Sequence, residues 1–370
     1  MHNVLLVEPD YYTRFPPLGL LKLATYLRDL GNQVKLVRGR ITLGNGFSAQ
    51  RIFVTSLFTY AWRPVHQAVA FYKQLYPDAE LTLGGIYASL LPDHAKLSGA
   101  DRVFVGQCSP ADAYVPAWDL VPDWDGSIII ATRGCIRKCE FCAVPQLEGA
   151  LRTSIESVKP FVWPQHKHII FWDNNILAGD WKHLFAELRE LNRWVDFNQG
   201  LDARLINYEI AREIARLKME YVRLAYDDAS MKPSIESAIS DLKRAGVRAK
   251  KIVVYTLYNF KDTPEDFKCR VQELLELGVT SYPMRYEPVN ALTKNEFVGE
   301  RWTPEELEMV ADARRVIGVA GAFPPYLGLV KKFCDASSFS EAFALRPPKR
   351  SDSQANHSVE KALPKAVQTL

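Results

Sequence analysis

The sequence predicts an α/β protein built from two parts, and three observations carry this prediction. Short apolar runs alternate with helical stretches over residues 1–110. A segment rich in proline and aromatic residues, 111–126, interrupts this alternation, which then resumes from residue 127 to about residue 300. Strands separated by helices pair in parallel, with helices covering both faces of the sheet. We therefore expect a doubly wound domain over 1–110, a linker, and a second parallel domain over 127–300.

The first part contains five short apolar runs that read as strands. Between them lie two helical stretches, residues 16–30 and 64–75, and Gly31 ends the first. Ligands of such sheets bind beyond the carboxyl ends of the strands. The predicted strands are 4–7, 34–37, 52–56, 81–85 and 103–106.

The second part repeats the order of strand and helix about six times. Six open units form a partial (β/α)6 barrel rather than a closed one, with the reacting groups again at the carboxyl ends of the strands. A helical extension, 301–338, and a charged tail, 339–370, follow, and the tail is expected to be disordered. The predicted strands are 127–131, 168–172, 195–199, 221–225, 251–257 and 281–286, and the helices are 179–192, 207–217, 234–245 and 264–277.

Composition excludes few classes of protein. The formal net charge of +3 over 370 residues is too small to indicate nucleic acid or a membrane surface. The start lacks the pattern of a secretion signal, and no apolar run has the length of a membrane span. Three of the six cysteines, Cys108, Cys269 and Cys334, are scattered. A disulfide framework is therefore not expected, and we predict a cytoplasmic protein.

The other three cysteines, Cys135, Cys139 and Cys142, fall within eight residues. Thiols this close together indicate a metal site, with ordinary buried cysteines as the alternative. Structural zinc takes four protein ligands, commonly as two separated pairs, and no second pair exists here. A 4Fe-4S cluster with three cysteine ligands instead leaves one iron open to bind a small molecule.

This cysteine loop resembles the cluster loop of radical S-adenosylmethionine (SAM) enzymes. The resemblance rests on the spacing of the three cysteines, on Phe141 before the last of them, and on the lead-in Arg133–Gly134. It implies a radical SAM barrel with a 4Fe-4S cluster, SAM bound at the open iron, and an electron donor such as flavodoxin or ferredoxin. Phe141 would lie near the adenine of SAM.

Polar residues after two further strands match positions that hold SAM in this family. Asp173 and Asn174 follow the second predicted barrel strand, where the family usually has an acidic or amide group for the SAM ammonium. Gln199, Asp202 and Arg204 follow the third strand and resemble the segment that reaches the ribose and carboxylate. The fork of Arg204 suits a carboxylate. Asp202 could accept from a ribose hydroxyl or pair with Arg204, and any of these residues could be a solvated loop residue.

The first domain resembles the flavodoxin-like, Rossmann-like cobalamin-binding domain that precedes many radical SAM barrels. Asp10 follows the first strand, and Gly84 and Gly85 follow the fourth, where glycine lets the backbone approach a flat ring or turn sharply. The cobalt-ligating version of that domain has an Asp-x-His-x-x-Gly motif, whereas residues 10–14 contain no histidine. Cobalamin binding and a domain that only shapes substrate access both stay open. Tyr286 ends the sixth barrel strand, where it could contact substrate or close the sheet.

The predicted function is therefore that of a radical SAM enzyme modifying an unactivated carbon, with or without cobalamin-dependent methyl transfer. The alternative is a non-catalytic or zinc-stabilised binding protein with a degenerate radical SAM fold. The substrate could be a small molecule, a peptide or a lipid. No dedicated nucleic-acid domain and no membrane span are recognisable in the sequence.

Overall fold

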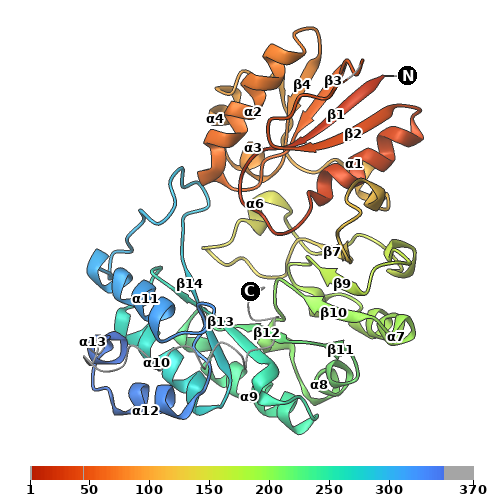
Figure 1. Ribbon diagram of the computed structural model, residues 1–370. Helices are drawn as coiled ribbons and strands as arrows, with labels where there is room; N and C mark the ends of the chain where they lie inside the picture. The colour runs from red at the N-terminus through yellow and green to blue at the C-terminus, as the bar shows by residue number, and fades with distance from the viewer. Residues whose placement is uncertain (1, 45, 346–370) are drawn as a thin grey trace, which may run out of the picture. The chain divides into compact units, whose positions relative to one another are not determined.

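The computed structural model describes residues 2–44 and 46–345 (Figure 1). The chain divides into two units: unit 1 is Met1–Arg193 with Glu287–Phe297, and unit 2 is Trp194–Tyr286 with Val298–Leu370. The segment Glu287–Phe297 thus belongs to unit 1, although both of its neighbours along the chain belong to unit 2.

Unit 1 begins with a five-stranded parallel sheet. The strand order is β2-β1-β3-β4-β5, so the sheet grows in opposite directions from β1. This arrangement confirms the predicted α/β class with a parallel N-terminal sheet. The strands are β1 (Asn3–Glu8), β2 (Gln33–Arg38), β3 (Arg51–Val54), β4 (Glu80–Leu83) and β5 (Arg102–Val103).

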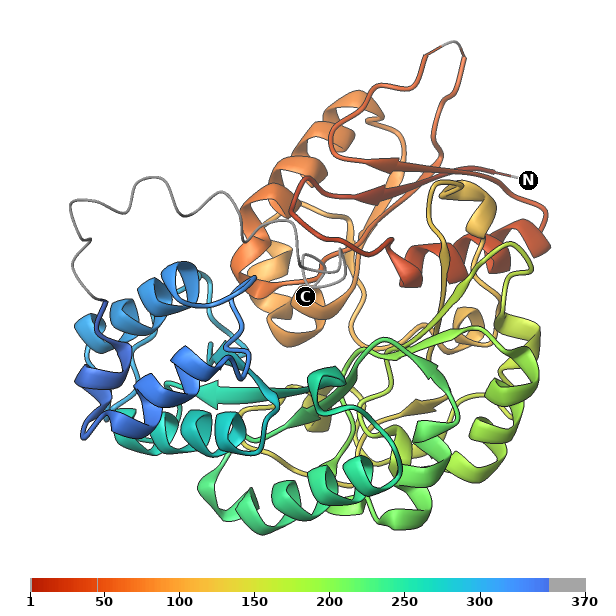
Figure 2. The ribbon, with the colours of Figure 1, turned by 60° about the horizontal axis from the view of Figure 1, so that its bottom comes forward.

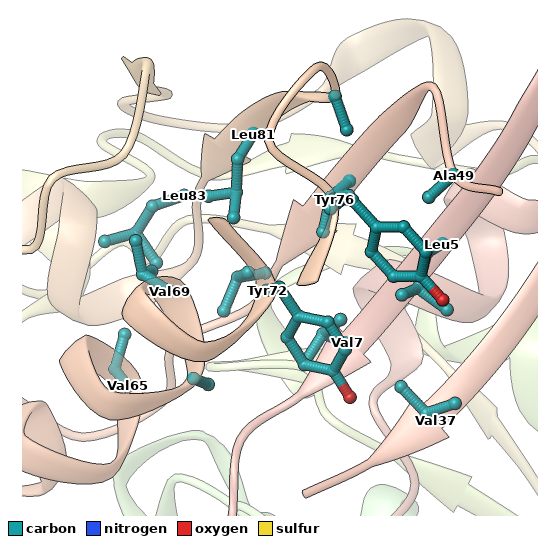
Figure 3. Close-up of a cluster of buried hydrophobic side chains, with 14 of the residues drawn as sticks. Leu5, Val7, Val37, Ala49, Val65, Val69, Tyr72, Tyr76, Leu81 and Leu83 are labelled. Atoms are coloured by element: carbon teal, nitrogen blue, oxygen red, sulfur yellow. The ribbon is translucent and has the colours of Figure 1, made fainter. Parts of the chain in front are cut away.

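Helices cover both faces of this sheet, and the side chains of β1 are apolar on both faces. Leu5 and Val7 face one apolar cluster, which includes α2 (Trp62–Leu75), while Val4 and Leu6 face another, which includes α1 (Leu18–Asp29). Figure 2 shows α1 and α2 flanking the strands, and Figure 3 shows the α2 side of the core. A strand buried on both faces reads as a continuous apolar run, as residues 4–7 do.

The rest of unit 1 is made of short elements. β6 (Gly126–Ile129) pairs in parallel with β9 (His168–Phe171), and β7 (Thr132–Arg133) pairs antiparallel with β8 (Arg152–Thr153). Trp118 of the segment 111–126 is buried in a cluster with α1, β6 and β9. The other helices of unit 1 are α3 (Ile86–Leu90), α4 (Pro92–Lys96), α5 (Ser109–Asp112), α6 (Val144–Leu147) and α7 (Trp181–Leu191).

Unit 2 contains two further sets of parallel strands. β10 (Trp194–Phe197) pairs with β11 (Lys218–Met219), and β13 (Ile252–Tyr258) pairs with both β12 (Val222–Ala225) and β14 (Thr280–Arg285). These parallel pairs confirm the strand-and-helix alternation of the second part. The described residues show no barrel closure, so the six-unit barrel stays a prediction. The helices are α8 (Tyr208–Ala215), α9 (Lys232–Arg244), α10 (Pro264–Glu276), α11 (Pro304–Val316), α12 (Leu327–Asp335) and α13 (Phe339–Phe343).

The C-terminal segment expected to be disordered is helical where it begins. Ser338 caps α13 by accepting from the Glu341 N–H at 3.3 Å, and Phe339 and Phe343 are buried in the apolar core that also holds Phe267. Residues 346–370, which carry the rest of that prediction, lie outside the described residues. Within the described ranges, no helix is both long and apolar enough to cross a membrane.

Candidate functional site

The three clustered cysteines lie in a loop that follows the carboxyl end of β6. All three side chains are half-buried, and the Cys142 N–H donates to the Cys139 carbonyl at 3.1 Å. Since β6 and β9 are parallel, the loop after β6 and the residues after β9 share one edge of the sheet. This is the edge at which reacting groups of strand-and-helix proteins gather.

The two ends of the cysteine loop are joined to each other. β7 enters the loop and pairs with β8, which follows it, through Thr132 opposite Thr153. The Cys135 N–H donates to the Gly149 carbonyl at 3.2 Å. At Gly134, φ is +74° and an added Cβ would lie 2.2 Å from the Ala150 carbonyl oxygen. Only glycine fits there, so the neck of the loop is closed by backbone contacts.

A network of charged side chains braces this neck, and we name it the neck network: Lys22, Asp112, Arg133, Glu148 and Asn174. Arg133 forms ion pairs with Asp112 at 2.6 Å and with Glu148 at 2.7 Å, and Lys22 reaches Asp112 at 3.1 Å. Glu148 Oε2 accepts from the Gly134 N–H and from Asn174 Nδ2, both at 2.8 Å. The network therefore ties the start of the loop to its end.

The four charged members of the neck network are at most 19 % exposed at their side chains. Burial opposes ionisation of Asp112, but the hydrogen bond and charge of Arg133 outweigh it and keep the pKa of this carboxyl below its usual value. Burial lowers the pKa of Lys22, against the attraction of Asp112. Buried charges of this kind are stable only when they are paired.

Asp173 holds the turn that leads from β6 into the loop. Its carboxylate accepts from the Ala131 N–H at 3.1 Å and from the Thr132 hydroxyl at 2.8 Å, and also from the Thr132 N–H. The residue is 2 % exposed, and burial raises its pKa to about 6, against these hydrogen bonds. In this structure the carboxylate is engaged by the chain itself. Its predicted contact with the SAM ammonium stays a prediction.

The sulfur atoms receive N–H donors. The Arg137 N–H lies 3.3 Å from Cys135 Sγ, and the Val144 N–H lies 3.5 Å from Cys142 Sγ. Asn175 Nδ2 reaches Cys135 Sγ at 3.7 Å. Hydrogen bonds to cysteine sulfur stabilise the thiolate and tune the reduction potential of a ligated cluster.

Within residues 2–44 and 46–345, no three His, Cys, Asp or Glu side chains are arranged to hold a metal ion. Three thiols, two of them with N–H donors at sulfur, are a donor set that an iron–sulfur cluster can take. The predicted cluster and the zinc alternative both stay predictions.

Phe141 lies in the same loop, between Cys139 and Cys142, and is half-buried. It lies beside Cys142 because it directly precedes that residue in the sequence. The predicted contact with an adenine ring stays a prediction.

The predicted contacts to the SAM ribose and carboxylate lie in unit 2. Gln199 is exposed in the turn after β10. Asp202 accepts from Arg204 Nε at 2.6 Å and from the Arg204 N–H at 3.2 Å. Of the two partners that the sequence left open for Asp202, the structure therefore shows Arg204. Of the predicted site residues, unit 1 contains Cys135, Cys139, Cys142, Phe141, Asp173 and Asn174, and unit 2 contains Gln199, Asp202, Arg204 and Tyr286.

Two of the predicted N-terminal positions contact the chain itself. At Gly85, φ is +100° and an added Cβ would lie 2.3 Å from the Ser56 carbonyl oxygen. Ser56 Oγ also donates to the Gly84 carbonyl at 2.6 Å. The glycine at 85 is thus required by the neighbouring strand end, without any ligand. Asp10 is exposed after β1.

Three charged residues that the predicted site does not include are enclosed near the ends of strands. Glu8, at the end of β1, is 2 % exposed, and burial raises its pKa to about 7 against the pull of Arg38. In unit 2, burial raises the pKa of Asp227, just after β12, to about 6. Arg270 from α10 is 1 % exposed and donates to the Tyr226 carbonyl at 2.8 Å. The position of an acidic residue directly after an apolar strand was the only available signal.

Tyr286 is half-buried at the end of β14. Its N–H donates to the Tyr258 carbonyl at 2.8 Å, and its ring lies 4.7 Å from that of Phe260. These contacts continue the pairing of β14 with β13, so closing the sheet is one role that the structure shows.

Comparison with known proteins adds no assignment. No model of a known protein family matches the chain, and no curated protein matches it.

Proposed function

We propose that this protein is a radical SAM enzyme whose 4Fe-4S cluster is held by Cys135, Cys139 and Cys142. The observation that carries the proposal is a loop of three half-buried thiols, with N–H donors at the sulfur atoms of Cys135 and Cys142 and with a closed, braced neck. A loop that only covered a surface would need neither three thiols nor a buried charged network at its base. Such a cluster, when reduced, supplies one electron that cleaves the sulfonium bond of SAM.

The chain's own residues have separable tasks in this proposal. The three thiolates would hold the cluster and would leave one of its irons without a protein ligand. The neck network and Asp173 hold both ends of the loop, so that the ligands keep one geometry. N–H donors at Cys135 and Cys142 stabilise the thiolate form. Phe141 would flank the adenine, and Gln199, Asp202 and Arg204 of unit 2 would contact the ribose and carboxylate.

In this proposal the domain of the N-terminal sheet either shapes the access of substrate or binds cobalamin. A Cβ added at Gly84 would lie 3.7 Å from Phe104, which is an ordinary van der Waals distance. Gly85 has no such space, because the Ser56 backbone occupies it. The proposed electron donor is a flavodoxin or ferredoxin, and the substrate is a small molecule, a peptide or a lipid.

The test is anaerobic reconstitution with iron and sulfide, followed by measurement of bound iron, sulfide, visible absorbance and SAM products. We expect about four irons per chain and 5′-deoxyadenosine on addition of reductant. S-adenosylhomocysteine formed only with added cobalamin would identify methyl transfer.

The decisive variants are Cys139→Ala and Cys108→Ala. The first removes a proposed ligand and should abolish both the cluster and SAM cleavage. The second removes a half-buried thiol of unit 1 outside the loop and should leave both unchanged. Stoichiometric zinc with no iron–sulfur absorbance, or equal loss in both variants, would contradict the proposal.

A further inference from the structure

Unit 1 has a cavity of about 460 Å³ at the amino ends of β6 and β9. Asp125 directly precedes β6, and Lys167 directly precedes β9. Because these strands are parallel, the cavity lies at the end opposite to the cysteine loop, and nothing in the proposed function uses it. Its volume is in the range of pockets for small ligands. Three indoles and three carboxylates dominate its lining: Trp118, Trp124, Trp163, Asp119, Asp123 and Asp125.

The indoles of this cavity are held in place from behind. Trp118 is 2 % exposed and meets the His166 ring edge to face at 5.0 Å. Trp124 donates from Nε1 to the Gly126 carbonyl, and its ring packs against Phe15 at 5.6 Å. The Trp163 backbone N–H donates to Ser127 Oγ at 2.9 Å, and its indole packs against the apolar cluster that contains Trp118. The cavity therefore presents two half-buried, packed indoles, Trp124 and Trp163, beside the buried Trp118.

The carboxylates differ in whether they already have a cationic partner. Asp119 binds Arg28 through two contacts of 2.9 Å. Asp125 accepts from the Lys167 N–H at 2.9 Å, and its carboxylate lies 3.6 Å from Lys167 Nζ. Asp123 is exposed at the rim and has neither a hydrogen bond nor an ion pair to the part of the chain that the structure describes. One carboxylate is thus left to act on a ligand.

The remaining titratable group of the lining adds no positive charge at neutral pH. His166 is 4 % exposed, and its Nδ1 lies 3.0 Å from Ser127 Oγ. Burial lowers the pKa of His166, although the nearby Asp125 opposes this. With Asp119 and Asp125 paired and His166 neutral, the cavity carries the excess negative charge of Asp123.

We propose that this cavity binds an organic cation of the methylated or quaternary ammonium type. Indole rings attract such cations through their negative faces, and a nearby carboxylate adds Coulomb attraction. A quaternary ammonium has no N–H groups, so a wall of indoles costs it no hydrogen bonds. A metal ion would find few ligands among the indoles, and an anion would be repelled by Asp123.

The test measures the binding of choline by ligand-observed NMR and by calorimetry. The same measurements on 3,3-dimethylbutan-1-ol give the comparison. This alcohol has the shape of choline with carbon in place of the charged nitrogen. We expect choline to bind with a Kd in the millimolar range, and the alcohol to bind at least about fivefold more weakly, as loss of about 1 kcal/mol of cation–π attraction implies.

Two variants and their matched controls locate the site. Asp123→Asn should weaken choline binding about threefold while leaving the alcohol unchanged, as for one exposed ionic contact. Trp163→Leu should weaken it about fivefold or more. Asp78→Asn and Trp181→Leu make the same changes elsewhere in unit 1 and should have no effect. Thermal unfolding of each variant checks that unit 1 is intact, and the exposed Asp123 keeps the test usable if Trp163→Leu fails to fold.

Three outcomes would overturn the proposal. Equal binding of choline and the alcohol would show an apolar cavity without cation selectivity. Unchanged choline binding in Asp123→Asn and in a folded Trp163→Leu would place the binding elsewhere. Absence of any choline signal at millimolar concentrations would show that the cavity takes no such ligand.

Discussion

The N-terminal sheet and the cysteine loop of unit 1 are both ordered, but by opposite means. The sheet is fixed by apolar side chains that are fully buried on both of its faces, as around Leu81 and Leu83 (Figure 3). The loop contributes almost no apolar core, and its ends are fixed by buried carboxylates and their donors. Only the second kind of order depends on the protonation state of single side chains.

This difference follows from the energetics of burial. Apolar contacts are non-directional and roughly proportional to buried area, so a sheet core loses stability in proportion to what is removed. A buried polar network is neutral or favourable only while every member is paired. Removing one member leaves the others buried without a partner.

The largest effect is expected for Arg133→Ala. The change would leave Asp112 and Glu148 in a buried place without their common guanidinium, and breaking such pairs costs about 4 kcal/mol. Urea unfolding of unit 1 at neutral pH measures it. Arg102→Ala removes an exposed arginine paired with Glu80 and should cost less than about 1 kcal/mol. If both variants lost the same unfolding free energy, the neck network would stabilise unit 1 no more than an exposed ion pair does.

The matching change in the sheet is Leu83→Ala. Leu83 is fully buried, and truncation of such a leucine costs about 3 kcal/mol through lost transfer energy and a cavity. The loss should be the same at pH 5 and at pH 7, because no titratable group is involved. If the loss of unfolding free energy differed by more than about 1 kcal/mol between pH 5 and pH 7, the sheet core would depend on pH as the loop does, and the comparison would be wrong.

The pH dependence of the loop is tested by Asp173→Asn. The pKa of Asp173 is raised to about 6 in the folded protein from an ordinary 3.8. Its contribution is thus fully present below pH 3.8 and is lost as the pH rises through 6. Between pH 4.5 and 6.5 the wild type should lose about 2 kcal/mol relative to the variant, whose amide does not titrate. Parallel stability profiles of the two proteins would contradict the assigned shift.

The smallest effect is expected for the polar contact within the apolar cluster of Figure 3. The Tyr72 hydroxyl donates to the Gly39 carbonyl at 2.9 Å and accepts from the Ile41 N–H at 3.0 Å. Tyr72→Phe should cost about 1 kcal/mol and speed hydrogen exchange at Ile41. Tyr76→Phe is the control, since its ring lies in the same cluster without these contacts. An unchanged exchange rate at Ile41 would show that the hydroxyl does not hold this segment.

Sequence pattern predicted the longer strands best where they are apolar runs of four or more residues. Residues 4–7 and 168–172, for example, correspond to β1 and β9 within two residues at each end. The two-residue strands β7 and β8 are too short to show any period. They form because the neck of the cysteine loop brings residues 132–133 and 152–153 together.

The candidate site was predictable only where chemistry is concentrated in one stretch of chain. Three cysteines in one loop are visible in the sequence, whereas the support of that loop comes from distant positions. Asp112 lies in a segment expected to be a linker, yet it contacts Lys22, 90 residues away, and Arg133. Gly85 was expected to let the backbone approach a flat ring or turn sharply, and the structure shows a positive φ there with the Ser56 backbone at the place of a Cβ. Pairings between remote residues leave no local pattern.

The segment Glu287–Phe297 has a consequence for how the protein can be divided. It belongs to unit 1 through contacts such as that of Trp62 Nε1 with the Leu292 carbonyl at 3.1 Å, and through Lys294 lying over the Tyr60 ring. A protein ended at Arg193 would lack this piece, and a protease cut between Arg193 and Glu287 would leave unit 1 in two fragments held without a covalent bond. Gene truncation therefore cannot isolate either unit as one uninterrupted stretch of chain.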